Sequence, residues 1–270
     1  MITGGNRGLG RALTEAALDA GHRVVATVRG EHSLPENEQL TVLPLDVRDR
    51  QAVVATVTEV VDRFGGLDVL VNNAGYGLIG AVEELSEDEV CSMIDTNLLG
   101  PLWLSQSAIP VMRRQGSGHI VQISTVGAVG TMPMLGLYNS SKWGLEGFSD
   151  AMAAEVRQFG IRVSLIEPGS LDTDWAGGSM RFSSPDPAYD ELRTEMFGTA
   201  EVPWPVEEST SGTAQDGTAP DDAATAILAH VAAQDDQRLR VLVGDDSPGQ
   251  VRAALDARLQ DYARDPRFPA

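Results

Sequence analysis

Short apolar segments alternate with longer amphipathic segments along most of the chain. The short segments are rich in valine, isoleucine and leucine, and the longer ones repeat apolar residues at helical intervals. This alternation predicts an α/β fold, in which crossover helices connect the strands of a parallel sheet. Strands are predicted at residues 23–28, 40–44, 69–72, 119–124, 162–166 and 240–243, and helices at residues 10–20, 50–64, 86–114, 137–158, 221–233 and 247–264.

Residues 174–220 interrupt the alternation. This segment is rich in glycine, proline, serine and acidic residues, with aromatic residues at irregular intervals. Its length exceeds that of ordinary connections and predicts a long mobile insertion in a single domain that spans residues 1–270. Because the aromatic residues suit closure over an apolar cleft, we interpret the insertion as a substrate lid, with static packing of the rings as the alternative.

The composition excludes several classes of function. With a formal net charge of -19, the protein would repel nucleic acid and anionic membranes. No apolar run reaches the ~20 residues that span a membrane, and no cleavable leader is expected at the start. The single cysteine, Cys91, favours a cytoplasmic location, and the four histidines lack ligand spacing, so no catalytic metal is predicted.

Candidate chemistry begins with Tyr138 and Lys142, which lie four residues apart in a predicted helix. Residues with this spacing share one helix face. An ammonium beside a phenol favours the phenolate, so the pKa of Tyr138 is predicted to fall from its ordinary value of roughly 10 toward neutrality. Such a hydroxyl acts as a general acid or base. Taken alone, the pair is common by chance and favours the interpretation of two surface residues.

A glycine-rich turn at the beginning of the chain changes that balance. Gly4, Gly8 and Gly10 would let the backbone approach a pyrophosphate at the start of a helix, although their spacing differs from the usual G-x-G-x-x-G. Arg29 occupies the position, at the end of the next strand, where an acidic residue would bind a free ribose 2′-hydroxyl. Together with Arg7 it favours a 2′-phosphate, and hence NADP(H), with NAD(H) as the alternative.

An ordered set of motifs resembles the short-chain dehydrogenase/reductase family. The motifs are TGGNRGLG at 3–10, NNAG at 72–75, Asn97, Tyr138 with Lys142, and PGSLDT at 168–173. Segments 25–29 and 172–177 resemble the branch related to 17β-hydroxysteroid and retinol dehydrogenases. The resemblance implies a Rossmann-like doubly wound parallel sheet flanked by helices, a small-molecule carbonyl or alcohol substrate, and a homodimer or homotetramer.

The same resemblance implies a set of site residues. Asp46 and Val47 would border the adenine, Lys142 would bind the nicotinamide ribose, and Asn97 would hold a water of the proton relay at a local break in its helix. Asn72 is interpreted as a residue that only pins strands and loops together. The implied cofactor-binding residues are Gly4, Asn6, Arg7, Gly8, Leu9, Gly10, Arg29, Asp46, Val47, Asn73, Ala74, Gly75, Tyr138, Lys142, Pro168, Gly169, Leu171 and Thr173.

The catalytic hydroxyl departs from the family pattern. Thr125 stands thirteen residues before Tyr138, where the family usually has serine, and Ser124 stands one place earlier. Successive strand residues point to opposite faces, so only one of the two serves. Thr125 has the right register and a hydroxyl that donates to a substrate oxygen, with Ser124 as the alternative.

The beginning of the chain is a second departure. Only Met1 and Ile2 precede the glycine turn, where family members have a longer central strand. Two residues would leave the neighbouring strands short of backbone hydrogen bonds. The sequence is consistent with a start further upstream and with a shortened central strand.

The leading hypothesis is an NADP(H)-dependent ketoreductase or alcohol dehydrogenase in which Tyr138 is the general acid or base. The alternatives are a dinucleotide-binding redox sensor without activity, which has little need of Tyr138 and Lys142, and a related dehydratase or epimerase. The predicted substrate is hydrophobic, because the residues expected to line its site are largely apolar. They are Tyr76, Leu78, Met132, Met134, Leu135, Trp175, Met180 and Phe182.

Overall fold

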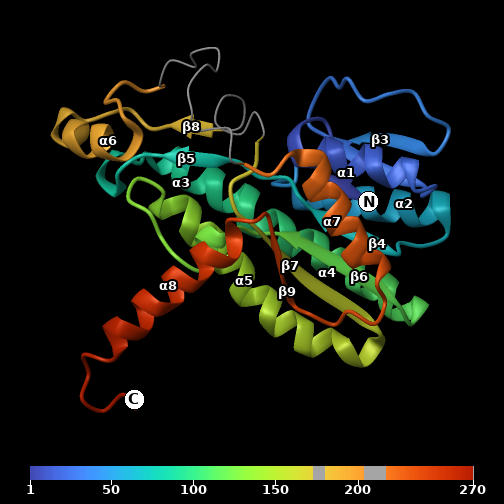
Figure 1. Ribbon diagram of the computed structural model, residues 1–270. Coiled ribbons are helices and arrows are strands. Elements are labelled where there is room, and N and C mark those ends of the chain that lie inside the picture. The colour runs from blue at the N-terminus through green and yellow to red at the C-terminus, as the bar shows by residue number, and fades with distance from the viewer. Residues whose placement is uncertain (173–179, 204–216, 270) are drawn as a thin grey trace.

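The computed structural model describes residues 1–172, 180–203 and 217–269 (Figure 1). Seven parallel strands form the main sheet, in the order β3-β2-β1-β4-β6-β7-β9. They are β1 (Ile2–Thr3), β2 (Val24–Val28), β3 (Leu40–Pro44), β4 (Val69–Asn72), β6 (Gly118–Ile123), β7 (Ile161–Pro168) and β9 (Arg240–Val243). Because the strand order reverses beside β1, the sheet is doubly wound, as predicted.

Helices cover both faces of the sheet. The helices α1 (Gly8–Asp19) and α7 (Pro220–Ala232) pack on one face, and α2 (Arg50–Phe64), α4 (Gly100–Gln115) and α5 (Gly136–Val156) pack on the other. Leu13 and Ile227 are fully buried on the first face, and Val53 and Leu104 on the second. No helix within the described ranges has both the length and the apolar character needed to cross a membrane.

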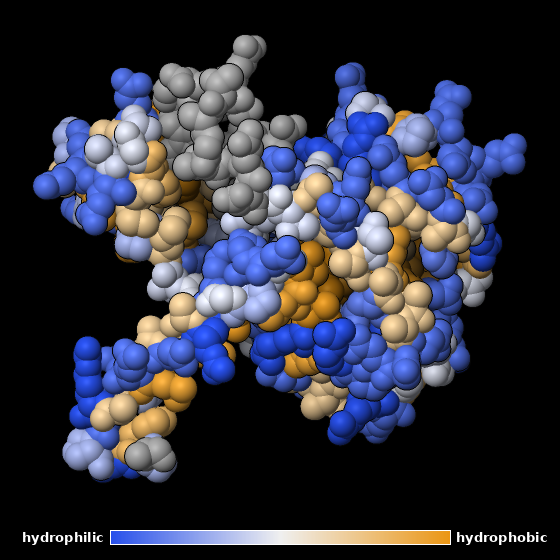
Figure 2. Space-filling model, in the orientation of Figure 1, coloured by the Kyte–Doolittle hydropathy of each residue, from blue (hydrophilic) through white to orange (hydrophobic). Residues whose placement is uncertain are grey.

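The last helix, α8 (Ser247–Tyr262), projects from the body of the molecule (Figure 1). Apolar side chains lie along this arm, and they include the exposed residues Leu255, Leu259 and Tyr262 (Figure 2). In the second half of α8, the Arg258 guanidinium lies 4.7 Å from the ring centroid of Trp143 in α5. The arm therefore contacts, through Arg258, the helix that carries Tyr138.

The central strand β1 is short but pairs on both sides. Ile2 is in register with Ala26 of β2 and with Val71 of β4. The side chain of Thr3 extends this pairing, because its hydroxyl donates to the carbonyl oxygen of Val71 at 3.3 Å. A side-chain hydrogen bond therefore compensates in part for the short backbone ladder.

The insertion has more structure than its composition predicts. Between its two undescribed parts it contains β8 (Met180–Phe182), which pairs in parallel with β5 (Gly77–Ile79), and the helix α6 (Asp190–Phe197). The buried guanidinium of Arg193 in α6 pairs with the buried carboxylate of Glu84. Residues 180–197 are thus tied to the body by a sheet pairing and a buried ion pair, and the mobility of the insertion stays a prediction.

Candidate active site

The turn between β1 and α1 takes its shape from its glycines. Gly4 and Gly8 have positive φ angles of 68° and 51°, which glycine adopts without strain. A Cβ atom on Gly10 would collide with the carbonyl oxygen of Gly4 and the side-chain amide of Asn73. The glycines therefore allow the close backbone approach that a dinucleotide cradle requires.

The first turn of α1 has the features of an anion site. Its N-cap residue, Arg7, makes no side-chain capping hydrogen bond, and the first turn contains no acidic residue. Backbone N–H groups at such a helix end bind phosphate groups. The side chain of Leu9 is buried in the core beside this turn, so it serves packing.

Arg29 is exposed at the end of β2, and the loop after it is tied to the glycine turn. Asn6 donates through Nδ2 to the carbonyl oxygen of Glu31 at 3.2 Å and accepts at Oδ1 from the backbone N–H of Ser33 at 3.0 Å. The side chain of Asn6, which the resemblance assigned to the cofactor, thus holds this loop beside the turn that carries Arg7.

Asp46 and Val47, expected to border the adenine, follow β3. Arg48 donates to both carboxylate oxygens of Asp46, with Nε at 3.0 Å from Oδ1 and Nη2 at 2.6 Å from Oδ2. This pairing holds the pKa of Asp46 below its ordinary value, and the charge of Arg29 acts in the same direction. Val47 is buried and contacts Gly100 at the start of α4.

The asparagine motif after β4 is anchored to β1. Asn73 donates through Nδ2 to the carbonyl oxygen of Thr3 at 2.8 Å, and the Thr3 hydroxyl accepts from the backbone N–H groups of Asn73 and Ala74, each at 3.0 Å. Asn72 donates to Oε1 of Gln122 at 2.9 Å. The interpretation of Asn72 as a pinning residue is confirmed.

A hydrogen bond joins the side chains of Thr125 and Tyr138. Tyr138 is buried near the start of α5, and Thr125 follows the end of β6 by two residues. Ser124 makes a different contact, because its hydroxyl donates to Oε1 of Glu146 at 2.6 Å. The structure therefore brings the hydroxyl of Thr125, and not that of Ser124, to Tyr138, as the strand register predicts.

Lys142 lies one helical turn after Tyr138 and is buried. Its ammonium donates to the carbonyl oxygen of Ile123 at 2.7 Å. A Cβ atom on Gly75 would lie 3.7 Å from Nζ of Lys142. The glycine at this position therefore brings the backbone of the asparagine motif close to the ammonium.

Burial sets the pKa values of the pair. It raises the pKa of Tyr138 to about 12, and the hydrogen bond with Thr125 opposes this shift. It lowers the pKa of Lys142 to about 8, and the negative charge of Glu146 opposes that shift. The predicted downward shift for Tyr138 is wrong, because loss of solvation of the phenolate outweighs the influence of the neighbouring ammonium.

A π-helical turn interrupts the predicted helix 86–114. The turn, Asp95–Leu99, separates α3 (Glu87–Ile94) from α4 and contains Asn97. The amide of Asn97 donates to the carbonyl oxygen of Tyr76 at 2.9 Å and to Oγ of Ser141 at 3.2 Å, and its oxygen accepts from the backbone N–H of Tyr76 at 3.1 Å. The predicted local break exists, and it joins the asparagine motif to α5. The role of Asn97 toward water stays a prediction.

The described residues of the expected substrate lining belong mainly to two apolar clusters. One surrounds Tyr138 and contains Tyr76, Leu78 and Leu135. The other joins β5, β8 and α6 and contains Met134, Met180 and Phe182. Met132 is exposed, and Trp175 lies outside the described residues.

Arg181 of β8 is a polar residue of this wall that the sequence analysis missed. Its guanidinium lies 4.4 Å from the ring centroid of Tyr76. Burial raises the pKa of Tyr76, and the charge of Arg181 opposes this shift. The contact depends on the pairing of β5 with β8, which short strands far apart in the sequence do not reveal.

The segment expected to hold the nicotinamide begins at Pro168, the last residue of β7. Gly169 donates to the carbonyl oxygen of Val243 at 3.0 Å, and a Cβ atom on it would collide with the carboxylate of Asp246. Leu171 pairs with Thr218, which closes the base of the insertion. This segment is therefore fixed by β9 and by the returning chain. Thr173 lies outside the described residues.

Comparison with known proteins identifies the family. The family model described as short chain dehydrogenase matches residues 1–181. The chain belongs to the short-chain dehydrogenase family. An oxidoreductase named BOA17 from Botryotinia fuckeliana is 40% identical to it over 195 residues, which cover 70% of this chain and 71% of the relative.

Two solved structures have the same fold. A short-chain dehydrogenase from Streptomyces avermitilis has a TM-score of 0.85 and 32% sequence identity, over 97% of this chain and 95% of its own. An alcohol dehydrogenase from the archaeon Thermococcus sibiricus, complexed with 5-hydroxy-NADP, has a TM-score of 0.70 and 26% identity, over 90% and 94% of the two chains. The chain is thus similar to short-chain dehydrogenases over nearly its whole length.

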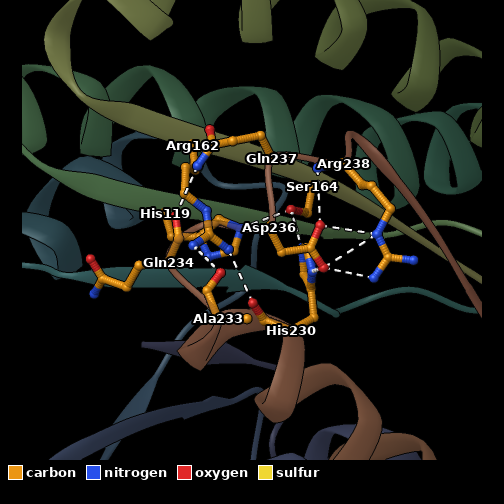
Figure 3. A network of polar contacts seen from close by, with 9 residues as sticks. All are labelled: His119, Arg162, Ser164, His230, Ala233, Gln234, Asp236, Gln237 and Arg238. Carbon is orange, nitrogen blue, oxygen red and sulfur yellow. Dashed lines mark hydrogen bonds and ion pairs between the residues drawn. The ribbon is translucent and has the colours of Figure 1, made fainter.

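The opposite edge of the dehydrogenase sheet contains a second cluster of catalytic residue types (Figure 3). Ser164 Oγ lies 2.8 Å from Nε2 of His230 and 2.8 Å from Nε2 of His119. Nδ1 of His230 lies 2.8 Å from Asp236, which also pairs with Arg238. Two of the histidines that the sequence analysis treated as scattered therefore meet around one serine.

Proposed function

We propose that this short-chain dehydrogenase is an NADP(H)-dependent oxidoreductase that interconverts a carbonyl group and a secondary alcohol on a hydrophobic substrate. The observation that carries the proposal is the hydrogen-bonded pair of Thr125 and Tyr138, next to Lys142 and the asparagine motif. This arrangement places a proton donor, a second hydroxyl and a cation together at the carboxyl edge of a doubly wound sheet, where ligands of such folds bind.

The residues at this edge fit a dinucleotide phosphate. Gly4 and Gly8 have positive φ angles and Gly10 has no room for a Cβ atom, so the turn is tight, and the first turn of α1 offers N–H groups without an acidic residue. Arg7 and Arg29 are the candidates for the ribose 2′-phosphate, since guanidinium groups bind phosphate through paired hydrogen bonds. The archaeal alcohol dehydrogenase complexed with 5-hydroxy-NADP supports NADP(H) as the nucleotide of this chain.

The buried phenol is suited to carbonyl reduction. With its pKa raised to about 12, Tyr138 is protonated at neutral pH and donates a proton to the substrate oxygen. The one hydroxyl proton of Thr125, which points to Tyr138 when no substrate is bound, turns to donate a hydrogen bond to the substrate oxygen when it binds. Lys142 holds the nicotinamide ribose and stabilises the phenolate that forms. NADPH, when bound, supplies the hydride.

The apolar clusters support a hydrophobic substrate. Tyr76 and Leu135 surround Tyr138, and residues of β5, β8 and α6 extend the apolar wall beyond them. We interpret residues 180–197 as a preformed wall of the substrate site, because Arg193 and Glu84 tie α6 in place. The lid predicted for the rest of the insertion falls mainly on residues 174–179 and 204–216, which lie outside the described residues.

A screen of hydrophobic ketones with NADPH and with NADH, followed by the absorbance of the reduced nicotinamide, tests this function. At least one ketone is expected to oxidise NADPH in preference to NADH. Thr125→Val should lower kcat by ~100-fold, because one positioned donor to the substrate oxygen is lost, while NADPH affinity stays within a few fold. Tight NADPH binding without turnover of any ketone would favour the redox sensor instead.

A further inference from the structure

Two buried glutamates lie next to the catalytic pair, and the chemistry above uses neither. Glu146 lies one helical turn after Lys142 in α5 and is 7% exposed, and Glu167 in β7 is 1% exposed. A buried carboxylate is unfavourable unless a cation or hydrogen-bond donors compensate it. The position of these two groups therefore calls for a physical account.

The contacts of Glu146 link the catalytic helix to two strands. Its Oε1 accepts from the hydroxyl of Ser124 at 2.6 Å, directly before Thr125. Its Oε2 lies 3.3 Å from Nε of Arg240 in β9, and the same nitrogen lies 3.4 Å from Oε1 of Glu167. One guanidinium thus faces two buried carboxyl groups.

The charge of Arg240 does not keep both carboxyl groups ionised. Burial raises the pKa of Glu167 to about 7, and the negative charge of Glu146 adds to the shift. As the pH falls below about 7, Glu167 therefore becomes mostly protonated and neutral. The remaining contact of Arg240, with the exposed Asp150 at 3.2 Å, lies at the surface.

We propose that Glu146 is a positioning residue that keeps the ammonium of Lys142 charged and fixes the end of β6 that carries Thr125. The proposal rests on the proposed function of Lys142 and Tyr138. The link to β6 is the bond with Ser124, whose own backbone N–H donates to Ile166 of β7 at 2.7 Å. A donor–acceptor chain therefore runs from the helix of Lys142 to the strand end of Thr125.

The effect of Glu146 on the charge of Lys142 depends on the titratable and charged groups around Glu146. They are Lys142 and Asp150 on its own helix, Glu167 on β7 and Arg240 on β9. Because burial alone disfavours the Lys142 ammonium, the negative charge one turn away opposes its loss. Removal of that charge lets Lys142 lose its proton at a lower pH, and removal of the competing cation Arg240 has the opposite effect.

The sequence makes a direct test possible, because Lys142 is the only lysine among the 270 residues. Protein with isotope-labelled lysine gives one side-chain ammonium signal in an NMR titration, with neither substrate nor turnover required. Glu146→Gln should move the midpoint of this titration to lower pH by ~0.5 unit or more, whereas Glu146→Asp should restore it in part. Arg240→Gln, at a residue 45% exposed, should move the midpoint to higher pH.

The control is Asp150→Asn, which removes a surface contact of Arg240 and should leave the midpoint within ~0.2 unit. Because Glu167 ionises more readily once Glu146 is neutral, Glu146→Gln with Glu167→Gln should give the largest shift. An unchanged midpoint in both the double variant and Arg240→Gln would overturn the proposal. Shifted midpoints in a protein that reduces no ketone would instead retain this electrostatic link and refute the proposed function.

Discussion

Two buried polar clusters lie at opposite edges of one sheet, and both contain residue types used in catalysis. At the carboxyl edge Thr125 contacts Tyr138, one turn from Lys142. At the amino edge Ser164, His230 and Asp236 follow one another at the hydrogen-bond distances of a hydrolytic triad, and His119 also contacts Ser164 (Figure 3). Only the first adjoins a glycine turn and an uncapped helix start. A pocket lies beside the second cluster as well, lined in part by Ser164, Arg162 and Asp236. The comparison therefore teaches that neither mutual distances nor a neighbouring hollow makes a site, and that the glycine turn and helix start beside Tyr138 distinguish the first cluster.

The amino-edge cluster is closed by its own hydrogen bonds. Ser164 is 1% exposed and its hydroxyl is occupied by two imidazole rings. Arg162 donates to the carbonyl oxygens of His230 and Ala233 at the end of α7. These contacts tie α7 to the middle of the sheet, so we interpret the cluster as a lock between β6, β7 and α7.

The largest expected effect separates the two clusters by activity. Tyr138→Phe removes the transferable proton but keeps the ring, so kcat should fall by ~100- to 10,000-fold while NADPH affinity stays within a few fold. Steady-state kinetics and a fluorescence titration with NADPH measure the two quantities.

The matched change in the other cluster is Ser164→Ala. It should leave kcat per folded molecule within about twofold but lower the free energy of unfolding by ~1–3 kcal/mol, because two buried ring nitrogens lose their partner. Near-normal turnover by Tyr138→Phe, or loss of turnover by folded Ser164→Ala, would reverse the assignment of the two clusters.

A smaller effect, on the preference for NADPH over NADH, tests whether the carboxyl edge binds the nucleotide. Arg29→Asp replaces a candidate partner of the 2′-phosphate with a repulsive charge and supplies an acceptor for a free ribose hydroxyl. The ratio of kcat/KM for NADPH to that for NADH should fall by ~30-fold or more, equivalent to ~2 kcal/mol. Arg23→Asp, an exposed arginine before β2, is the control and should leave the ratio unchanged. Equal use of both nucleotides by the wild-type protein would already contradict the assignment.

Local patterns predicted the frame of the molecule. The predicted strand 69–72 coincides with β4, and the spacing to Tyr138 pointed to Thr125, whose side chain is hydrogen-bonded to Tyr138. Each of these depends on neighbours in sequence, where alternation and register act directly. The sequence contains a further local signal for this site, because its one lysine is Lys142. The pKa of a lysine shifts readily on burial, whereas an arginine at this position would stay charged.

Long-range burial accounts for the features that the sequence did not predict. Helical spacing showed that Lys142 neighbours Tyr138 but gave no sign that both are buried, so the direction of the pKa shift on Tyr138 was wrong. The pairing of Arg193 with Glu84 and the meeting of His119 with His230 join distant parts of the chain. Such contacts follow from how the elements pack, and no periodicity of the sequence encodes them.

The smallest expected effect concerns the pH dependence of the amino-edge lock. Burial lowers the pKa of His119 from 6.5 to about 3. The unfolded chain therefore takes up this proton first, and the stability contributed by neutral His119 is present above pH 6.5 and is lost as the pH falls from 6.5 toward 3. For one group, the loss between pH 6.5 and 5.5 is ~1 kcal/mol.

Urea unfolding of wild type and His119→Gln at pH 6.5 and 5.5 measures the contribution of His119 to the free energy of unfolding. Glutamine can donate to Ser164 in place of Nε2 but does not titrate, so the variant should lose ~1 kcal/mol less than wild type over the interval. His22→Gln, at an exposed position, should follow wild type. Glu167 contributes in the opposite direction, because its raised pKa makes the folded protein gain stability as the pH falls through about 7, but it does so equally in all three proteins. Identical losses in wild type and His119→Gln would mean that His119 takes up its proton in the folded protein as readily as in the unfolded chain, and that the hydrogen bonds of the lock do not exclude water from His119.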